Sequence, residues 1–161
     1  MIALYIVRHG LAVPYGTPGI ADDDRPLTPK GRRRVRQIAQ GLRILGVEPG
    51  RIVTSPLPRA KETARILSEV FELGVDPEDE TTLRAGNPAG AILAWLQEQS
   101  EERLTIVGHD PAFSDLAGML VRGTGVCELA KGGVAAFVGA SISELKLEWL
   151  ATPRLLRRIR D

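Results

Sequence analysis

The chain has 161 residues, of which 43% are hydrophobic and 25% are charged, and its formal net charge is +1. This length and balance predict one globular domain over residues 1–161, with a core that needs no cross-links. The near-neutral charge and the lack of an apolar run of about 20 residues argue against nucleic acid and a membrane as partners. The single cysteine, Cys127, and the lack of a basic leader ahead of Arg8 predict a cytoplasmic location.

The first predicted element is a strand that begins at Ile2 and ends in Arg8, His9 and Gly10. Its unbroken apolar run, IALYIV, is typical of a strand that is buried on both faces of a parallel sheet. Ligands of open α/β sheets bind just beyond the carboxyl ends of the strands. The arginine and the histidine are therefore expected where chemistry takes place. Residues 11–26 follow, and their glycines, prolines and aspartates predict a long loop, which in a small domain is usually functional or disordered.

Along the rest of the chain, short apolar strands alternate with amphipathic helices. Four of the predicted helices open with a capping residue followed by proline, a pattern typical of helix N-termini: Thr28-Pro29, Ser55-Pro56, Asn87-Pro88 and Asp110-Pro111. The first of these helices is expected to end near residue 45, the fourth near 121, and a short terminal helix is expected within 153–160. Strands are expected at 51–54, near 81–83, at 103–107, and as a hairpin of 133–138 with 144–150. This alternation predicts an α/β sandwich with a mainly parallel sheet.

The chain has two histidines, and both stand at the end of an apolar strand, in YIVRHG and TIVGHD. This repeated placement of His9 and His109 favours an active site over a structural role. A metal site of both histidines and Asp110 is one alternative, but Arg8 would repel a cation, and helix N-termini favour anions. Arg59, in SPLPRAKET, has a guanidinium that could match phosphoryl oxygens. It could equally be a solvated helix residue.

Four motifs in order resemble the histidine phosphatase superfamily, the phosphoglycerate mutase-like proteins: RHG at 8–10, RPLTPKG at 25–31, SPLPRAKET at 55–63 and VGHDP at 107–111. The short length and the RPLT motif resemble the small SixA-type phosphohistidine phosphatases most closely. The resemblance covers most of the chain. It implies a phosphoglycerate mutase-like fold, which is a three-layer α/β/α sandwich around a mainly parallel mixed sheet.

The resemblance also implies roles for the strand-end residues. His9 would be the nucleophile and form a transient phosphohistidine, while Arg8, Arg59 and His109 would bind the phosphoryl oxygens. Elementary chemistry agrees, because phosphoryl transfer mainly needs positioning and neutralisation of charge on the equatorial oxygens. A neutral imidazole can attack phosphorus and later pass the phosphoryl group to water.

Two further residues would complete the predicted phosphate site. Gly10 would let the backbone turn closely past the phosphate. Arg25 of the RPLT motif would add positive charge at the rim. No cofactor and no metal are implied.

The sequence departs from the family where mutases and many phosphatases have an acidic residue in a Leu-x-Glu pattern. The comparable stretch is Leu83-Arg84-Ala85, and Ala85 cannot donate a proton. An alkyl phosphate needs a proton donor for its alkoxide leaving group. A phosphoimidazole can instead leave as neutral imidazole, so the missing acid favours phosphohistidine as the substrate. Two smaller departures are Leu11, and Asp110 where related small members commonly have Asn.

The sequence thus predicts a phosphatase that removes the phosphoryl group from phosphohistidine in a protein and releases inorganic phosphate. A small-molecule phosphomonoesterase with Asp24 or Glu80 as substitute acid stays open, as does a non-catalytic phosphate-binding module. An intact His9 beside Arg8 argues against the module, since a binder needs no nucleophile. The basic run KGRRRVR at 30–36 predicts a solvated helix face or a docking patch for an acidic partner rather than a nucleic-acid site.

Overall fold

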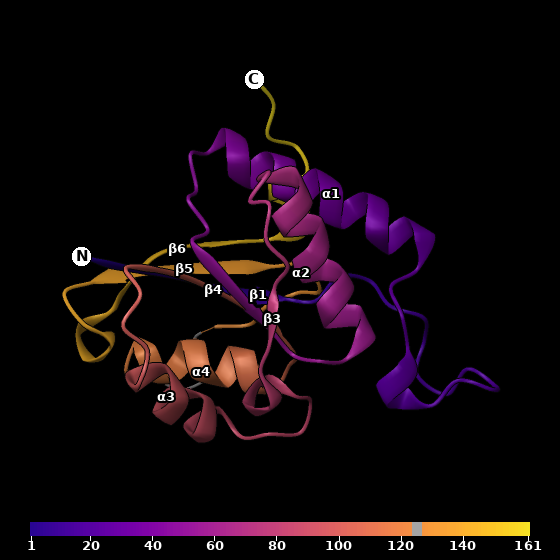
Figure 1. Ribbon diagram of the computed structural model, residues 1–161, viewed down its shortest axis with the longest axis horizontal. Helices are drawn as coiled ribbons and strands as arrows, with labels where there is room; N and C mark the ends of the chain where they lie inside the picture. Colours follow the sequence, from indigo (N-terminus) through magenta and orange to yellow (C-terminus); the bar gives the residue numbers. More distant parts are fainter. Residues whose placement is uncertain (124–126) are drawn as a thin grey trace.

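The structure, a computed structural model, describes residues 1–123 and 127–161. Its centre is a six-stranded mixed sheet with the strand order β3-β2-β4-β1-β5-β6 (Figure 1). The strands are β1 (Ile2–Arg8), β2 (Arg51–Thr54), β3 (Glu78–Asp79), β4 (Arg103–Gly108), β5 (Val134–Gly139) and β6 (Lys146–Ala151). The first four in this order run parallel, whereas β5 is antiparallel to both β1 and β6. The predicted mainly parallel mixed sheet and the C-terminal hairpin are confirmed.

Helices cover both faces of this sheet (Figure 1). On one face lie α1 (Pro29–Ile44), α2 (Pro58–Val70) and α5 (Pro153–Leu156), and on the other α3 (Ala89–Gln97) and α4 (Ala112–Leu120). Alternate residues of β1 enter the two cores, with Leu4 and Ile6 on the α3–α4 side and Val7 on the α1–α2 side. An unbroken apolar run is needed for a strand buried on both sides. The predicted three-layer α/β/α architecture is confirmed.

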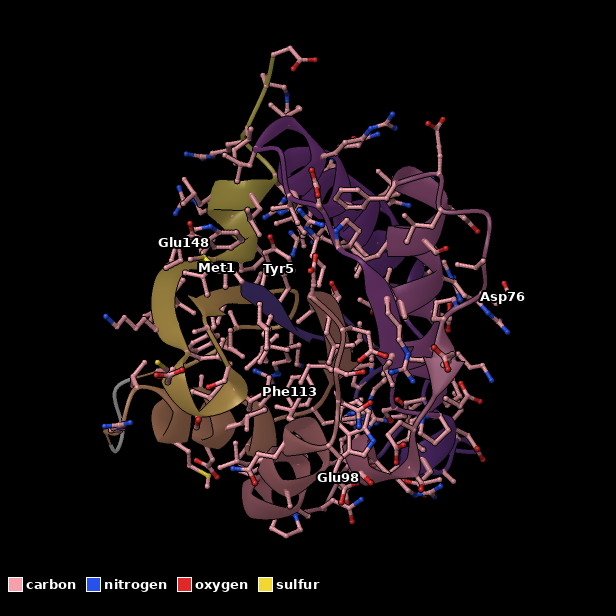
Figure 2. All side chains as sticks on the ribbon, turned by 60° about the vertical axis from the view of Figure 1, so that its left-hand side comes forward. Met1, Tyr5, Asp76, Glu98, Phe113 and Glu148 are labelled. Carbon is pink, nitrogen blue, oxygen red and sulfur yellow. The ribbon has the colours of Figure 1, made fainter. Side chains whose placement is uncertain are left out.

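Packing against the sheet is close on the α4 side. Phe113 of α4 is fully buried, and a Cβ on Gly108 would lie 2.5 Å from its ring. Figure 2 shows Phe113 in the interior, whereas Asp76 and Glu98 lie at the surface. In the described part of the chain, no helix has the length and apolar character to cross a bilayer.

The helix starts follow the predicted capping pattern only in part. Thr28 caps α1, because its Oγ1 accepts from the Gly31 N–H at 2.9 Å. The predicted start of the second helix at Pro56 is wrong, since α2 begins at Pro58. Ser55 instead accepts from the Leu57 N–H at 3.3 Å and contacts a histidine. Leu57 is extended because the proline that follows it disfavours helical backbone angles, so the helix begins two residues later than predicted.

The third and fourth helices also begin one residue later than their prolines. Asn87 does not cap α3, because its side-chain amide donates to the carbonyls of Thr81 and Thr82. Asp110 still caps the turn ahead of α4, where its Oδ1 accepts from the Ser114 N–H at 3.0 Å. The C-terminal helix α5 is shorter than the predicted 153–160.

The strand predicted near residues 81–83 is wrong. Thr81–Leu83 form a 3₁₀ turn, and the pairing strand β3 lies earlier, at Glu78–Asp79. The Glu80 carboxylate accepts from the Thr82 N–H at 2.8 Å, which favours a turn at this point. The predicted long loop 11–26 is present, with one 3₁₀ turn at Asp22–Asp24 and a bridge between Ala12 and Leu27.

Candidate active site

The two histidines lie side by side at the carboxyl edge of the sheet. Strands β1 and β4 are parallel neighbours whose register pairs Arg8 with Gly108, so the next residue of each strand is a histidine. The ring centroids of His9 and His109 are 5.2 Å apart, with the ring planes tilted by 57°. Only 5% and 4% of these residues are exposed, so both imidazoles are largely shielded from water.

The tautomer of His9 follows from its backbone contact. Its Nδ1 lies 2.7 Å from the Gly10 carbonyl oxygen, and a carbonyl can only accept, so Nδ1 carries the hydrogen. Nε2 then holds the lone pair. Burial is the main cause that lowers the pKa of His9 to about 3; the contact with Gly10 opposes the shift, and nearby His109 and Arg59 reinforce it. His9 is therefore a neutral imidazole at neutral pH, the state that can attack phosphorus.

His109 is held by a buried serine. Its Nε2 lies 2.7 Å from the Oγ of Ser55, which is fully buried after strand β2. Burial, followed by the positive charges of Arg59 and Arg25, lowers the pKa of His109 to about 3. Within the described residues, Nδ1 of His109 is buried and has no hydrogen-bond partner. If the Ser55 hydroxyl donates to Nε2, Nδ1 carries the hydrogen and can donate to an anion.

Two arginines bring guanidinium groups to the same edge. Arg8 donates from Nη1 to the Leu129 carbonyl at 2.8 Å and lies 3.7 Å from the Asp110 carboxylate. Arg59, in the first turn of α2, is 3% exposed and donates from Nη1 to the Asp22 carbonyl at 2.9 Å. Burial and then the charge of Arg25 lower the pKa of Arg59. Each guanidinium thus has one nitrogen engaged in holding its position.

Three buried nitrogens of the candidate site residues have no hydrogen-bond partner among the described residues: Nε of Arg8, Nε of Arg59 and Nδ1 of His109. Buried polar atoms in proteins are nearly always hydrogen-bonded. Charged and neutral donors that gather beside a neutral imidazole match a group with several oxygens and a negative charge. The arrangement can therefore hold a phosphoryl group next to the Nε2 lone pair of His9.

Arg25 holds the loop 11–26 near this site. Its Nε donates to the Asp22 carboxylate at 2.7 Å and its Nη1 to the Val13 carbonyl at 2.8 Å. Its charge reaches the site, since it helps to lower the pKa of both Arg59 and His109. Arg25 therefore lies at the rim, with its donors directed largely to its own loop.

Gly10 is required by the packing of α1 against the end of β1. A Cβ at this position would lie 2.4 Å from Cγ2 of Val35 and 3.5 Å from Cδ2 of Leu27. The Gly10 N–H donates to Oγ1 of Thr63 at 3.1 Å. The small size of Gly10 therefore permits the close approach of helix α1.

Two residues of the site were not identified from sequence. Ser55 was interpreted as a helix cap, yet strand register places it beside the second histidine, since β2 pairs Thr54 with Val107. The signal was available, because Ser55 follows its strand as His109 follows the neighbouring strand. Thr63 accepts from Gly10 and donates to the Arg59 carbonyl at 2.8 Å, and so links the α2 turn to the end of β1. No local pattern marks that role.

The acidic side chains near the site are mostly engaged elsewhere. Asp23 pairs with Arg84, Asp22 pairs with Arg25, and Glu80 accepts from the Thr82 N–H. Asp24 is exposed and makes no side-chain hydrogen bond to the described residues. The position at which the family pattern has its acid is occupied by a half-buried alanine, Ala85.

Comparison with known proteins assigns the family. Residues 4–85 match the family model described as Histidine phosphatase superfamily (branch 1). The chain belongs to the histidine phosphatase superfamily. An uncharacterized protein of Picosynechococcus shares 40% identity over 123 residues, which are 74% of this chain and 73% of that protein. The phosphohistidine phosphatase SixA of Escherichia coli shares 28% identity over 123 residues, 74% of each chain.

Solved structures of this family show the same fold. The protein histidine phosphatase SixA complexed with tungstate superposes with a TM-score of 0.84 at 24% identity, over 95% of this chain and 98% of that one. A phosphoglycerate mutase from Bacillus anthracis superposes with a TM-score of 0.70 at 17% identity, over 96% of this chain and 95% of that one. The resemblance to this superfamily and to its SixA-type members, inferred from the motifs, is confirmed.

Proposed function

We propose that this phosphatase hydrolyses phosphohistidine carried by a protein, through a phosphohistidine intermediate on His9. The observation that carries the proposal is the neutral His9, whose free Nε2 lies in a site with three unpartnered buried nitrogens of Arg8, Arg59 and His109. Membership of the histidine phosphatase superfamily supports phosphatase chemistry. Similarity to the phosphohistidine phosphatase SixA of Escherichia coli supports phosphohistidine as the substrate. A phosphohistidine-bearing partner protein and a cytoplasmic location belong to the same proposal.

In the first step, the Nε2 lone pair of His9 attacks phosphorus as the bond between phosphorus and the substrate imidazole breaks. The leaving imidazole carries a proton on its other nitrogen and so departs as a neutral molecule. Arg8, Arg59 and His109 donate to the equatorial oxygens, where charge is concentrated in the transition state. The donors are held in advance by the strand ends and by the first turn of α2, so little reorganisation is needed.

In the second step, water attacks the phosphoryl group on His9 and the bond between Nε2 and phosphorus breaks. Inorganic phosphate leaves, the proton from water passes to phosphate or solvent, and His9 returns to its neutral form. The hydrogen on Nδ1 of His9 is donated to the Gly10 carbonyl oxygen throughout, so the same tautomer begins each cycle.

Among the described residues, no acidic side chain occupies the position of the family's acid, and this supports the choice of substrate. Ala85 has no ionisable group, while Asp22, Asp23 and Glu80 are engaged in other contacts. A poor alkoxide leaving group would need such an acid, which typically contributes roughly 10²–10⁴-fold. A substrate imidazole leaves without it.

The test compares turnover of a phosphotransfer domain phosphorylated on histidine with turnover of a matched alkyl phosphate. We expect wild type to favour the phosphohistidine substrate strongly and His9→Ala to lose both activities while it stays folded. Ala85→Glu should raise alkyl phosphatase activity selectively. If wild type favours the alkyl ester and Asp24→Asn removes that activity, the substrate is a small phosphate ester. Binding of phosphate with no turnover of either substrate would contradict the enzymatic proposal.

A further inference from the structure

Positive charge in this protein is concentrated in two segments that lie together. Residues 29–44 and 152–161 hold ten Lys and Arg and a single acidic residue, Asp161. Because the whole chain has a formal net charge of only +1, the remaining residues carry a net charge of −8. The two segments form α1 and the α5 tail, which pack against each other at Gly41 and Leu156. In Figure 1 the C-terminal tail extends past α1, on the side of the sheet away from α3 and α4.

The two flanks of α1 differ in how this charge is balanced. On the flank that faces α2, three ion pairs with glutamates neutralise the charge of the α1 arginines. The pairs are Arg32–Glu62 at 2.7 Å, Arg36–Glu69 at 2.9 Å and Arg43–Glu72 at 3.1 Å. On the flank that faces α5, no acidic side chain among the described residues pairs with the cations. These cations are Lys30 and Arg34 of α1, which share a helix face with Gln37, and Arg154, Arg157, Arg158 and Arg160 of the α5 tail. We call this set, together with Gln37, the α1–α5 basic face.

Part of this face is a shaped hollow. Gln37 and four arginines, Arg154, Arg157, Arg158 and Arg160, line a cavity of about 280 Å³. Nε of Arg157 is buried there and has no hydrogen-bond partner among the described residues. Leu155, an apolar side chain that is 58% exposed, lies between these arginines in the sequence. Arginine is enriched in protein–protein interfaces and among the residues that contribute most to their binding energy.

The α1–α5 basic face borders the candidate active site. The first turns of α1 pack directly on the end of β1, since a Cβ on Gly31 would lie 2.0 Å from the Leu11 carbonyl oxygen. The chain enters α5 at the same edge of the sheet, because Ala151 is paired with Val134, and Val134 with Val7. On another side of the site, the loop carries the exposed acidic turn Asp22–Asp24. The surroundings of the site are therefore electrically asymmetric.

We propose that the α1–α5 basic face docks an acidic surface of the phosphorylated substrate protein. Complementary charge speeds encounter and fixes the orientation of the partner. A basic face on one side and an acidic turn on another would favour one orientation of a protein that carries its phosphohistidine beside an acidic patch. This inference rests on the proposed function for the identity of the partner, and concerns how that partner is recognised.

The face suits a protein better than nucleic acid or a membrane. Neither α1 nor the α5 tail contains an aromatic side chain on which bases could stack. Helix α5 has only four residues, which is too short for the continuous apolar face of an interfacial membrane helix.

The experiment uses charge reversal at exposed positions of the face, Arg154→Glu and Arg158→Glu. The matched control is Lys146→Glu, an equal change in charge at an exposed site at the start of β6. The substrates are an acidic phosphotransfer domain phosphorylated on histidine, and the small molecule phosphoimidazole. We expect each face variant to raise KM for the protein substrate about tenfold at low salt, with kcat and the turnover of phosphoimidazole unchanged. Added salt should reduce the difference between wild type and variant.

Calorimetry measures binding of the unphosphorylated domain, and so tests the docking surface without requiring turnover. If wild type hydrolyses neither substrate but binds the domain through the face, the proposed function fails and the docking surface stands. Unchanged KM and unchanged domain binding in both face variants would overturn the docking surface, as would an equal effect of Lys146→Glu. Wild type could instead bind single-stranded DNA or anionic vesicles more tightly than the acidic domain. If Arg158→Glu removed that binding, the face would belong to a different class of partner.

Discussion

Ser55→Ala should destabilise the protein by about 1–3 kcal/mol, the cost of leaving a buried hydrogen-bonding group without its partner. The Ser55 hydroxyl is fully buried and lies 2.7 Å from Nε2 of His109. Its second contact, from the Leu57 N–H, is longer at 3.3 Å, so most of the loss should come from the histidine. Urea unfolding followed by circular dichroism measures this change.

The same substitution should weaken binding at the site, which a purely structural serine would not do. Without the hydroxyl, His109 can take the tautomer with hydrogen on Nε2, which turns a lone pair rather than a donor toward an anion. Ser68→Ala is the matched control, since this serine is also buried and its hydroxyl donates at 2.6 Å to the Val75 carbonyl, near the far end of α2. We expect similar losses of stability but weaker vanadate binding only in Ser55→Ala. The nitrogen chemical shifts of His109 report its tautomer directly. Equal vanadate affinity in both variants, with unchanged shifts, would refute the reasoning.

Three further outcomes are expected. Arg59→Ala should weaken competitive inhibition by vanadate by about 1–3 kcal/mol, the scale of a charged hydrogen bond left unmade, whereas Arg65→Ala, exposed on the same helix, should not. Gly10→Ala should cost about 1–3 kcal/mol in thermal unfolding, because its Cβ would lie 2.4 Å from Val35, and Val35→Ala should recover part of that loss in the double variant. Because both histidines have a pKa lowered to about 3, the unfolded chain takes up protons first, near its ordinary pKa of about 6.5. The free energy of unfolding should therefore fall as pH is lowered below about 6.5, approaching about 1.4 kcal/mol per pH unit for each histidine, and urea midpoints that stay flat down to pH 5 would contradict this.

The parts of the fold that were predictable from sequence are those with local physical causes. Strands β1 and β4 are buried on both faces and so read as continuous apolar runs, and Thr28-Pro29 marks the start of α1 because its cap is local. Strand β3 has only two residues, both exposed, which leaves no periodicity to detect. The start of α2 was missed because Ser55-Pro56 and Leu57-Pro58 both offer a proline for the first helical position, and Leu57 is extended.

The same distinction holds for the candidate site. His9, Arg8 and His109 could be placed at one edge of a sheet because each stands at, or just after, the end of an apolar strand. The roles of Ser55 and Thr63 depend on the register between strands and on the orientation of α2, which no single stretch encodes. The balance of charge on α1 could not be predicted either, since the glutamates that neutralise one flank belong to another helix.

The central place of β1 in the sheet has a consequence for how the protein reaches this structure. Its neighbours pair Ala3 with Arg103 and Ile2 with Gly139, so the first strand of the sequence meets its partners only after about a hundred further residues. At ordinary rates of synthesis this interval is on the order of ten seconds. Throughout that time the apolar segment IALYIV, with its strong preference for extended structure, has no partner strand and can associate with other chains. The strand that ends just before the proposed nucleophile should therefore need protection during folding, and yields on rapid expression should be limited by aggregation through it.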